Sequence, residues 1–374
     1  MGLNRRAFLS ATAIALVSSG CGAAGGGNSR GSAEDNTPRQ QGGPLTDAQF
    51  ESLVDEAKAE GKLTFYTVPG EETMRAWVKP FEEKYGIQVE FYRATVSDIY
   101  RRFTEESSRG RHLADVVSMS VPAYIEEAVE KGWAIQYRTR TYDDLDPRLI
   151  TADAGYPMYA VITSIAWNEN EVSPALQERL RSGDYTAMLS DELNNRVGIV
   201  SPTAGGSQLG AHMAIVEDPR LGWSYLEKLR ESGAAIFESA VPFTANDLAS
   251  GEYAAGIAVP DAVAIPRIYE GAPIQIAYPD PAPASMHQFF LSANAPHRAA
   301  GQLFLEWGTT LEAQESLSEI SGGLIGHRKW RDKRKVLETS WYKSPPAGID
   351  VAWQEELSLQ EGDQFIEEWL DRLG

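Results

Sequence analysis

The sequence predicts an α/β protein with two doubly wound lobes, and three observations lead to this prediction. The chain has 374 residues, more than one hydrophobic core usually organises. From Leu45 onward, short β-rich runs alternate with amphipathic stretches, the pattern of βαβ units around parallel strands. Glycine or proline separates many of these segments, and no repeat of fixed period indicates a solenoid.

The first lobe opens with a predicted helix that Thr46 caps and Gly61 ends. A second helix begins at Glu71 and ends at Gly86, and a third surrounds Ile99 and Phe103. Strands are predicted at 63–68, 87–92 and 114–118. Three strands joined by helices form one parallel sheet.

The second half of the chain repeats the same alternation. The β-rich run 159–167 is long enough to cross between the lobes. Further strands are predicted at 196–200, 234–237, 254–259, 274–277 and 288–292, with a helix at 299–307.

The first 45 residues predict an export signal and a tether. Arg5 and Arg6 precede the apolar run 7–17, and small residues lead to Cys21, the one cysteine of the chain, so residues 1–21 are predicted to be a signal peptide. The end of this segment resembles a bacterial lipobox, which predicts lipidation of Cys21 and anchoring on the extracytoplasmic side of the membrane; a plain secretory cleavage site is the alternative. The paired arginines fit either the twin-arginine or the general export route. Residues 22–45, which follow Cys21, are poor in apolar side chains and are expected to form a flexible linker.

The charge balance excludes some partners. Lys and Arg number 34 against 53 Asp and Glu, a formal net charge of −19. Such a field repels nucleic acid and anionic membrane surfaces. It does not define the ligand, because a local pocket can oppose the global field.

Several segments together resemble the iron(III)-type solute-binding proteins of ABC importers. They are residues 56–66 (EAKAEGKLTFY), 81–89 (FEEKYGIQV), 114–117 (ADVV), 167–168 (WN), 248–256 (LASGEYAAG) and 295–297 (APH). The resemblance implies a type II periplasmic-binding fold, in which hinge strands join two lobes that close on a ligand. It also implies a monomer that delivers a small molecule or ion to a permease. Lobe 1 is then expected at 46–160 and 280–320, lobe 2 at 161–279, and a C-terminal helical segment at 321–374 packing on the lobes.

Ligands of open α/β sheets bind outside the carboxyl ends of the strands, where helix N-termini point. This rule selects loop residues after the predicted strands. The predicted ligand-binding residues are Thr67, Val68, Ser118, Ser120, Thr203, Gly205, Gly206, Ser207, Ser239, Thr244 and Asp261. Ser207, Ser120 and Asp261 have an alternative role as helix caps. The loop 201–207 suits an anion such as a phosphonate or carboxylate.

Ferric iron is a second candidate ligand that the residues do not decide. The chain has no adjacent tyrosine pair, and its five histidines lack metal-ligand spacing. Ferric iron stays a candidate ligand because Tyr66, Tyr124 and Glu72 offer oxygen donors. The residues that would bind the metal are unknown. No resident cofactor is expected.

An enzyme is not expected. The sequence lacks a nucleophile elbow of the form Gly-x-Ser-x-Gly and a phosphate loop ending in Gly-Lys-Ser/Thr. A sensor for a membrane receptor remains an alternative to transport, and a secreted hydrolase is a more distant one.

Overall fold

The structure is a computed structural model that describes residues 43–279, 283–344 and 359–374. The predicted signal peptide, Cys21 and nearly all of the predicted linker lie outside the described residues. Among the helices of the described residues, none has the length and apolar character that crossing a membrane requires.

Lobe 1 is built on a sheet whose first three strands are parallel, as the sequence predicts. β1 (Lys62–Thr67) lies between β2 (Gln88–Arg93) and β3 (Val116–Met119). β9 (Ala284–Leu291) pairs antiparallel with β3 and returns the chain to this lobe. The helices of lobe 1 are α1 (Asp47–Glu60), α2 (Glu71–Tyr85), α3 (Val96–Ser108), α4 (Pro122–Glu130), α10 (Arg298–Gly308) and α11 (Leu311–Ser321).

Local sequence signals fix the ends of the first helices. The Thr46 hydroxyl accepts from the Gln49 amide and the Gln49 side chain accepts from the Thr46 amide, which completes a capping box. Gly61 and Gly86 end α1 and α2 in the left-handed region, with φ of 72° and 70°. The predicted bounds of both helices are therefore confirmed.

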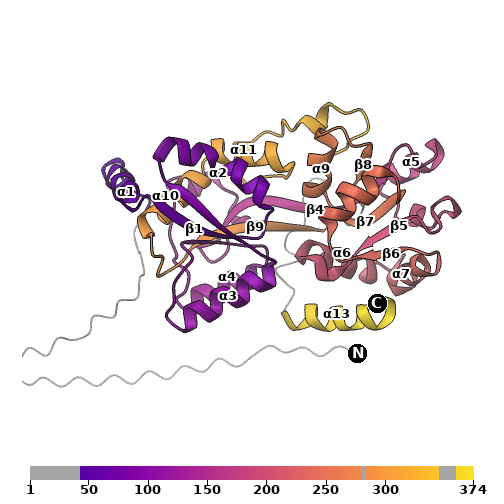
Figure 1. The fold of residues 1–374 in the computed structure, drawn as a ribbon, viewed down its shortest axis with the longest axis horizontal. Helices are drawn as coiled ribbons and strands as arrows, with labels where there is room; N and C mark the ends of the chain where they lie inside the picture. Colours follow the sequence, from indigo (N-terminus) through magenta and orange to yellow (C-terminus); the bar gives the residue numbers. More distant parts are fainter. Residues whose placement is uncertain (1–42, 280–282, 345–358) are drawn as a thin grey trace, which may run out of the picture. The chain divides into compact units, whose positions relative to one another are not determined.

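One long strand passes from lobe 1 into lobe 2 (Figure 1). The first half of β4 (Tyr156–Asn168) pairs antiparallel with β9, in the register Ile162 to Ala284. Its second half pairs antiparallel with β7 (Ala255–Pro260) and β8 (Ile274–Ala277). All of β4 is buried, so the strand that joins the lobes is also part of both cores.

Lobe 2 continues the sheet from β7. β5 (Val197–Val200) lies parallel to β7 on one side and to β6 (Ala235–Phe237) on the other. The helices of lobe 2 are α5 (Pro174–Arg181), α6 (Gly206–Glu217), α7 (Gly222–Glu231), α8 (Ala240–Pro242) and α9 (Asp261–Tyr269).

The cores of the two lobes have different centres. In lobe 1, Trp77 of α2 packs edge-on against Phe289 of β9 and Phe304 of α10, with ring centroids 6.1 and 5.5 Å apart. In lobe 2, Phe243 fills the space above two strand glycines, because a Cβ on Gly198 or Gly256 would lie 2.4 or 2.6 Å from its ring. These rings hold the strands in place and leave the carboxyl ends of the strands exposed to the cleft described below.

The C-terminal part differs from the helical segment expected at 321–374. Residues 322–344 contain one short 3-10 helix, Lys335–Glu338, and otherwise run irregularly. A long helix returns only at α13 (Leu359–Leu373). It packs on α6 and α7, where Trp369 is fully buried and Phe365 stacks on Trp223 at 5.2 Å. The last helix is thus part of the surface of lobe 2 (Figure 1).

Candidate functional site

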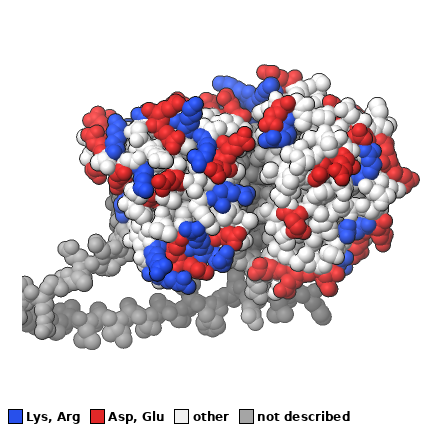
Figure 2. Space-filling view, in the orientation of Figure 1, with Lys and Arg blue, Asp and Glu red and all other residues white. Residues whose placement is uncertain are grey.

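A cleft of about 750 Å³ lies between the lobes. Figure 2 shows the groove between them, with charged side chains of both signs on its flanks. Loops that follow strands β1, β2, β3, β5, β6 and β7 line it, as the rule for open α/β sheets predicts. These loops, with the strand ends before them and the first helical turns after them, contribute residues 68–73, 93, 95–97, 120–121, 202–209, 239–241, 260 and 262–263.

Several helices begin at this cleft, and three of them have N-caps that cannot accept a hydrogen bond through a side chain. The N-caps of α2, α4 and α6 are Gly70, Val121 and Gly205. Outside the cleft, Thr46, Ser173 and Thr310 cap α1, α5 and α11 through their hydroxyls, whereas α7 has Leu221 as its N-cap and no side-chain cap. At the cleft itself, Thr95 caps α3. The amides at the start of α10 donate to the Glu60 carboxylate. Three helix ends at the cleft, those of α2, α4 and α6, thus favour a negative group and have no side-chain acceptor at the N-cap. Glu71 and Glu72 in the first turn of α2 add two carboxylates at one of these ends.

The start of α6 lies close to the opposite lobe. Gly205 is extended, with φ of 165° and ψ of 171°. A Cβ on Gly206 would lie 3.7 Å from the Ser120 hydroxyl of lobe 1. Behind it, the buried Ser207 hydroxyl donates to the side-chain oxygen of Gln208 at 3.1 Å. Ser207 is in the first turn of α6 and Gly205 is its N-cap, so the capping alternative for Ser207 is excluded.

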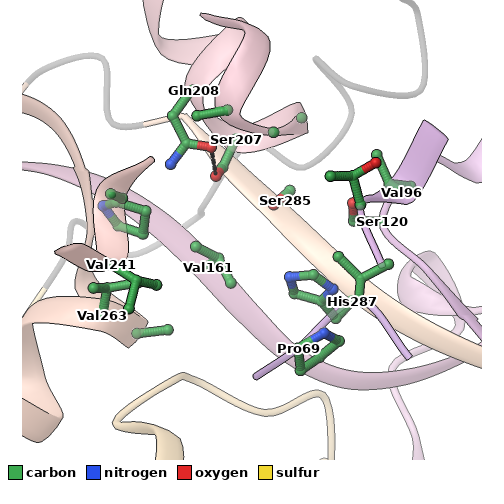
Figure 3. A pocket seen from close by; sticks show the side chains of 18 of the residues that line it. Pro69, Val96, Ser120, Val161, Ser207, Gln208, Val241, Val263, Ser285 and His287 are labelled. Carbon is green, nitrogen blue, oxygen red and sulfur yellow. Dashed lines mark hydrogen bonds between the residues drawn. The ribbon is translucent and has the colours of Figure 1, made fainter. Parts of the chain in front are cut away.

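The crossing strands form the floor of the cleft. Tyr159 and Val161 of β4 and Ser285 and His287 of β9 line the cleft. Figure 3 shows Val161, Ser285 and His287. The rings of Tyr159 and His287 lie 5.2 Å apart. Burial lowers the pKa of His287 to about 4, so this imidazole is neutral at pH 7. Its Nδ1 atom is buried and has no hydrogen-bond partner among the described residues.

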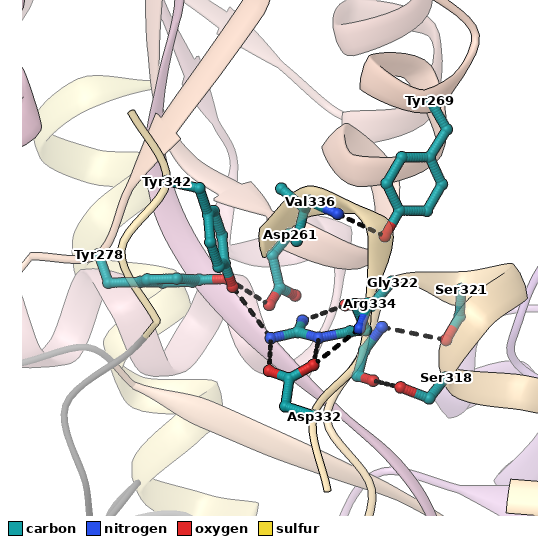
Figure 4. A network of polar contacts seen from close by, with 11 residues as sticks. Asp261, Tyr269, Tyr278, Ser318, Ser321, Gly322, Asp332, Arg334, Val336 and Tyr342 are labelled. Carbon is teal, nitrogen blue, oxygen red and sulfur yellow. Dashed lines mark hydrogen bonds and ion pairs between the residues drawn. The ribbon is translucent and has the colours of Figure 1, made fainter. Parts of the chain in front are cut away.

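A polar network lies beside the floor (Figure 4). The Asp261 carboxylate accepts from the amides of Ile162 and Ala262 at 2.9 and 2.7 Å, and from the Tyr278 hydroxyl at 3.0 Å. Tyr278 in turn lies 3.1 Å from the Tyr342 hydroxyl, which accepts from the buried Arg334 at 3.0 Å. The network ties the crossing strand and α9 to the irregular C-terminal segment.

Asp261 is therefore placed differently from the expectation that it faces a ligand or caps a helix. It is fully buried and is not among the residues that line the cleft, and the N-cap of α9 is Pro260. Burial raises the pKa of Asp261 to about 6, and hydrogen bonds and the Arg334 charge limit the rise.

The predicted residues divide into two groups. Those that line the cleft are Val68, Ser120, Thr203, Gly205, Gly206, Ser207 and Ser239. Thr67, Ser118 and Thr244 are fully buried, are not among the lining residues, and have hydroxyls without a hydrogen-bond partner in the described part of the chain. Ser120 does not cap α4 because the N-cap is Val121. Thr203 lines the cleft, but its hydroxyl donates to Glu238 at 2.5 Å.

The candidate iron donors do not come together. Tyr124 and Glu72 line the cleft, whereas Tyr66 is buried in lobe 1 and donates to Glu106 at 2.9 Å. Across residues 43–279, 283–344 and 359–374, no three side chains of His, Cys, Asp or Glu are grouped so that they could hold a metal ion.

Sequence reasoning missed the floor residues and the contribution of α13. Gly362, Asp363 and Ile366 of α13 line the cleft. A signal was present for α13, because Phe365, Trp369 and Leu373 recur every four residues as one apolar helical face. For the floor there was none, since consecutive buried residues of β4 and β9 do not show which side chain faces the cleft.

Comparison with known proteins places this geometry in context. Residues 76–346 match the family model of bacterial extracellular solute-binding proteins. Among solved structures, the substrate-binding protein of an ABC transporter from Agrobacterium tumefaciens has a TM-score of 0.69 at 14% identity, covering 85% of this chain and 96% of that chain. Iron-bound HitA from Pseudomonas aeruginosa has a TM-score of 0.66 at 17% identity, covering 83% and 99%.

AfuA from Actinobacillus pleuropneumoniae, solved with fructose-6-phosphate, has a TM-score of 0.63 at 17% identity, covering 84% of this chain and 98% of that chain. A comparison with curated protein sequences finds no match. At these identities the structures establish the fold, which is the two-lobed type II fold of periplasmic binding proteins.

Proposed function

Because the chain belongs to the family of bacterial extracellular solute-binding proteins, we propose that its cleft captures a small organic anion and delivers it to an ABC import permease. The anion is a carboxylate or a phosphonate. Closure of the lobes about the crossing strands retains it, since a ligand that contacts both lobes favours the closed state.

The proposal of an anionic ligand is supported by the helix N-termini at the cleft. α2, α4 and α6 begin there at Gly70, Val121 and Gly205, and none of these caps offers an acceptor. A helix N-terminus carries roughly half a positive charge. Several helices elsewhere receive a Thr, Ser or Glu acceptor, and an anionic solute would supply one at α2, α4 and α6.

The remaining parts of the proposal concern the chain as a whole. The protein acts as a binding protein without a resident cofactor and not as an enzyme. Cys21 carries the lipid that anchors a monomer outside the membrane, after export by the twin-arginine or the general route. This part rests on the sequence alone.

One charge substitution tests the anion directly. Gln208 is 4% exposed and lies in the first turn of α6, so Gln208→Glu adds a negative charge beside the proposed anion. At an effective dielectric constant of about 20, two charges about 6 Å apart interact by roughly 3 kcal/mol. We expect at least a tenfold loss of affinity for carboxylates or phosphonates found by a thermal-shift screen and measured by calorimetry.

The matched control is Gln136→Glu, which adds the same charge on the exposed surface of lobe 1 outside the cleft. It should leave the affinity unchanged. The proposal that the ligand is an anion would be contradicted by a screen in which only polyamines or ferric complexes raise the melting temperature. A Gln208→Glu variant that binds its ligand more tightly would contradict it as well.

A further inference from the structure

The cleft also has an apolar wall, formed by Val161, Val241 and Val263. Val241 of α8 is 57% exposed, more than any other large apolar side chain in the described part of the chain. It lines the cleft together with Val263 of α9 and Val161 of β4. Apolar surface exposed inside a groove commonly marks a binding site.

The polar and apolar groups occupy different sides. In Figure 3, Val241 and Val263 lie on one side, Ser120 and His287 on the other, and Val161 between them. Ser207 and Gln208, in the first turn of α6, lie on a third side of this view, above Ser285. A solute that contacts the first turn of α6 and also fills the cleft therefore meets valine side chains.

The wall has a consequence for the solute. An inorganic anion or a metal ion would leave the exposed Val241 in water, whereas a hydrocarbon group would cover it. Each methylene removed from water raises affinity about fourfold. A cleft of about 750 Å³ also falls within the range of sites that take organic molecules.

We infer that the solute is an amphipathic organic anion, with a compact anionic group at the first turn of α6 and an apolar body of several carbon atoms against Val161, Val241 and Val263. The inference rests on the proposed function and narrows it. It separates this cleft from sites for metal ions, inorganic phosphate and polyamines.

Alkylphosphonates and alkanoates of increasing length test the apolar body. With methyl-, butyl- and hexylphosphonate, and with acetate, butyrate and hexanoate, calorimetry on the wild-type protein should show at least a tenfold gain in affinity from the shortest to the longest chain. Hexylammonium, which has the same hydrocarbon body and the opposite charge, should not bind. Binding of hexylammonium as tight as that of hexylphosphonate would overturn the inference.

Val241→Ser removes the most exposed part of the wall. It should reduce the ratio of hexylphosphonate to methylphosphonate affinity at least fivefold. Leu113→Ser is the matched control, because Leu113 is 50% exposed and lies outside the cleft; it should retain the wild-type ratio. Equal ratios in the two variants would overturn the inference.

The outcomes also separate the inference from the function it rests on. If wild-type protein binds every member of a series equally, the anion site stands and the apolar body is wrong. If neither series binds, the proposed anion function fails and the inference fails with it.

Discussion

Replacing Asp261 by asparagine is expected to change how the stability of the protein depends on pH. The carboxylate is fully buried among the amides of Ile162 and Ala262 and the hydroxyl of Tyr278. An asparagine side chain has similar size, keeps an oxygen acceptor and carries no charge at any pH. The substitution therefore isolates the cost of ionising this buried group.

The sign follows from the two pKa values. Burial raises the pKa from 3.8 to about 6 in the folded protein. Between these values the folded state holds a proton that the unfolded state has released, so wild-type stability falls as pH rises through this window. Each unit of difference in pKa corresponds to about 1.4 kcal/mol, so the loss is complete above about pH 6 and amounts to roughly 3 kcal/mol.

Urea unfolding of both proteins at several pH values between 4 and 7.5 measures this effect. Any hydrogen bond that asparagine makes less well contributes an offset that is independent of pH. The buried histidines are present in both proteins, so the difference in unfolding free energy isolates Asp261. As pH rises from 4 to 7, the unfolding free energy of the wild type should fall by about 2 kcal/mol relative to that of the variant. A difference that stays constant with pH would refute the raised pKa and its cause.

Three further substitutions, two of them paired with a control variant, test the fold and the lipid anchor. Trp369→Ala removes a fully buried ring and should weaken the docking of α13 by about 3 kcal/mol or more, seen as faster amide exchange in that helix; Leu370→Ala, at a position 48% exposed, should not. Gly183→Ala places a methyl 2.5 Å from the Tyr278 carbonyl oxygen at φ of 76° and should lower the unfolding free energy by about 2 kcal/mol or more. Gly110→Ala, at φ of 66° in open space, should cost about 1 kcal/mol in the same urea titration. Cys21→Ala should release the protein from the membrane fraction, and retention there would argue against lipidation.

Much of the fold could be predicted because its signals are local. The bounds of α1 follow from Thr46 and Gly61, which satisfy the helix ends with groups three or four residues away. The parallel strands of lobe 1 follow from short β-rich runs between helices, and the observed order is confirmed by the pairing of β1 with β2 and β3. The loops at the cleft follow from the same order of elements.

The position of Asp261 could not be predicted, because it depends on distant contacts. Its partner Ile162 is 99 residues away in the chain, and Arg334 reaches the same network through Tyr342 and Tyr278. A carboxylate at the start of a predicted helix resembles a cap or a ligand-binding group in sequence. Its burial, its hydrogen bonds to Ile162 and Tyr278, and the N-cap at Pro260 show that it is neither.

The neutral imidazole in the floor of the cleft leads to a prediction about affinity. An anion bound near His287 stabilises its protonated form, so the pKa rises above about 4 on binding and a proton is taken up. Affinity for an anion should therefore increase as pH falls from 7 towards 5, with a slope of at most about tenfold per pH unit.

The comparison variant is His287→Gln, which retains a polar side chain without an imidazole. Other ionisable side chains line the cleft in both proteins, and they are Glu71, Glu72, Arg93, Tyr124, Tyr159, Arg267 and Asp363. The difference in pH slope between the two proteins therefore isolates His287. Calorimetry in two buffers of different ionisation enthalpy would count the proton taken up by the wild type. Equal slopes would mean that the imidazole does not sense the bound anion, and that the helix N-termini provide the favourable field without it.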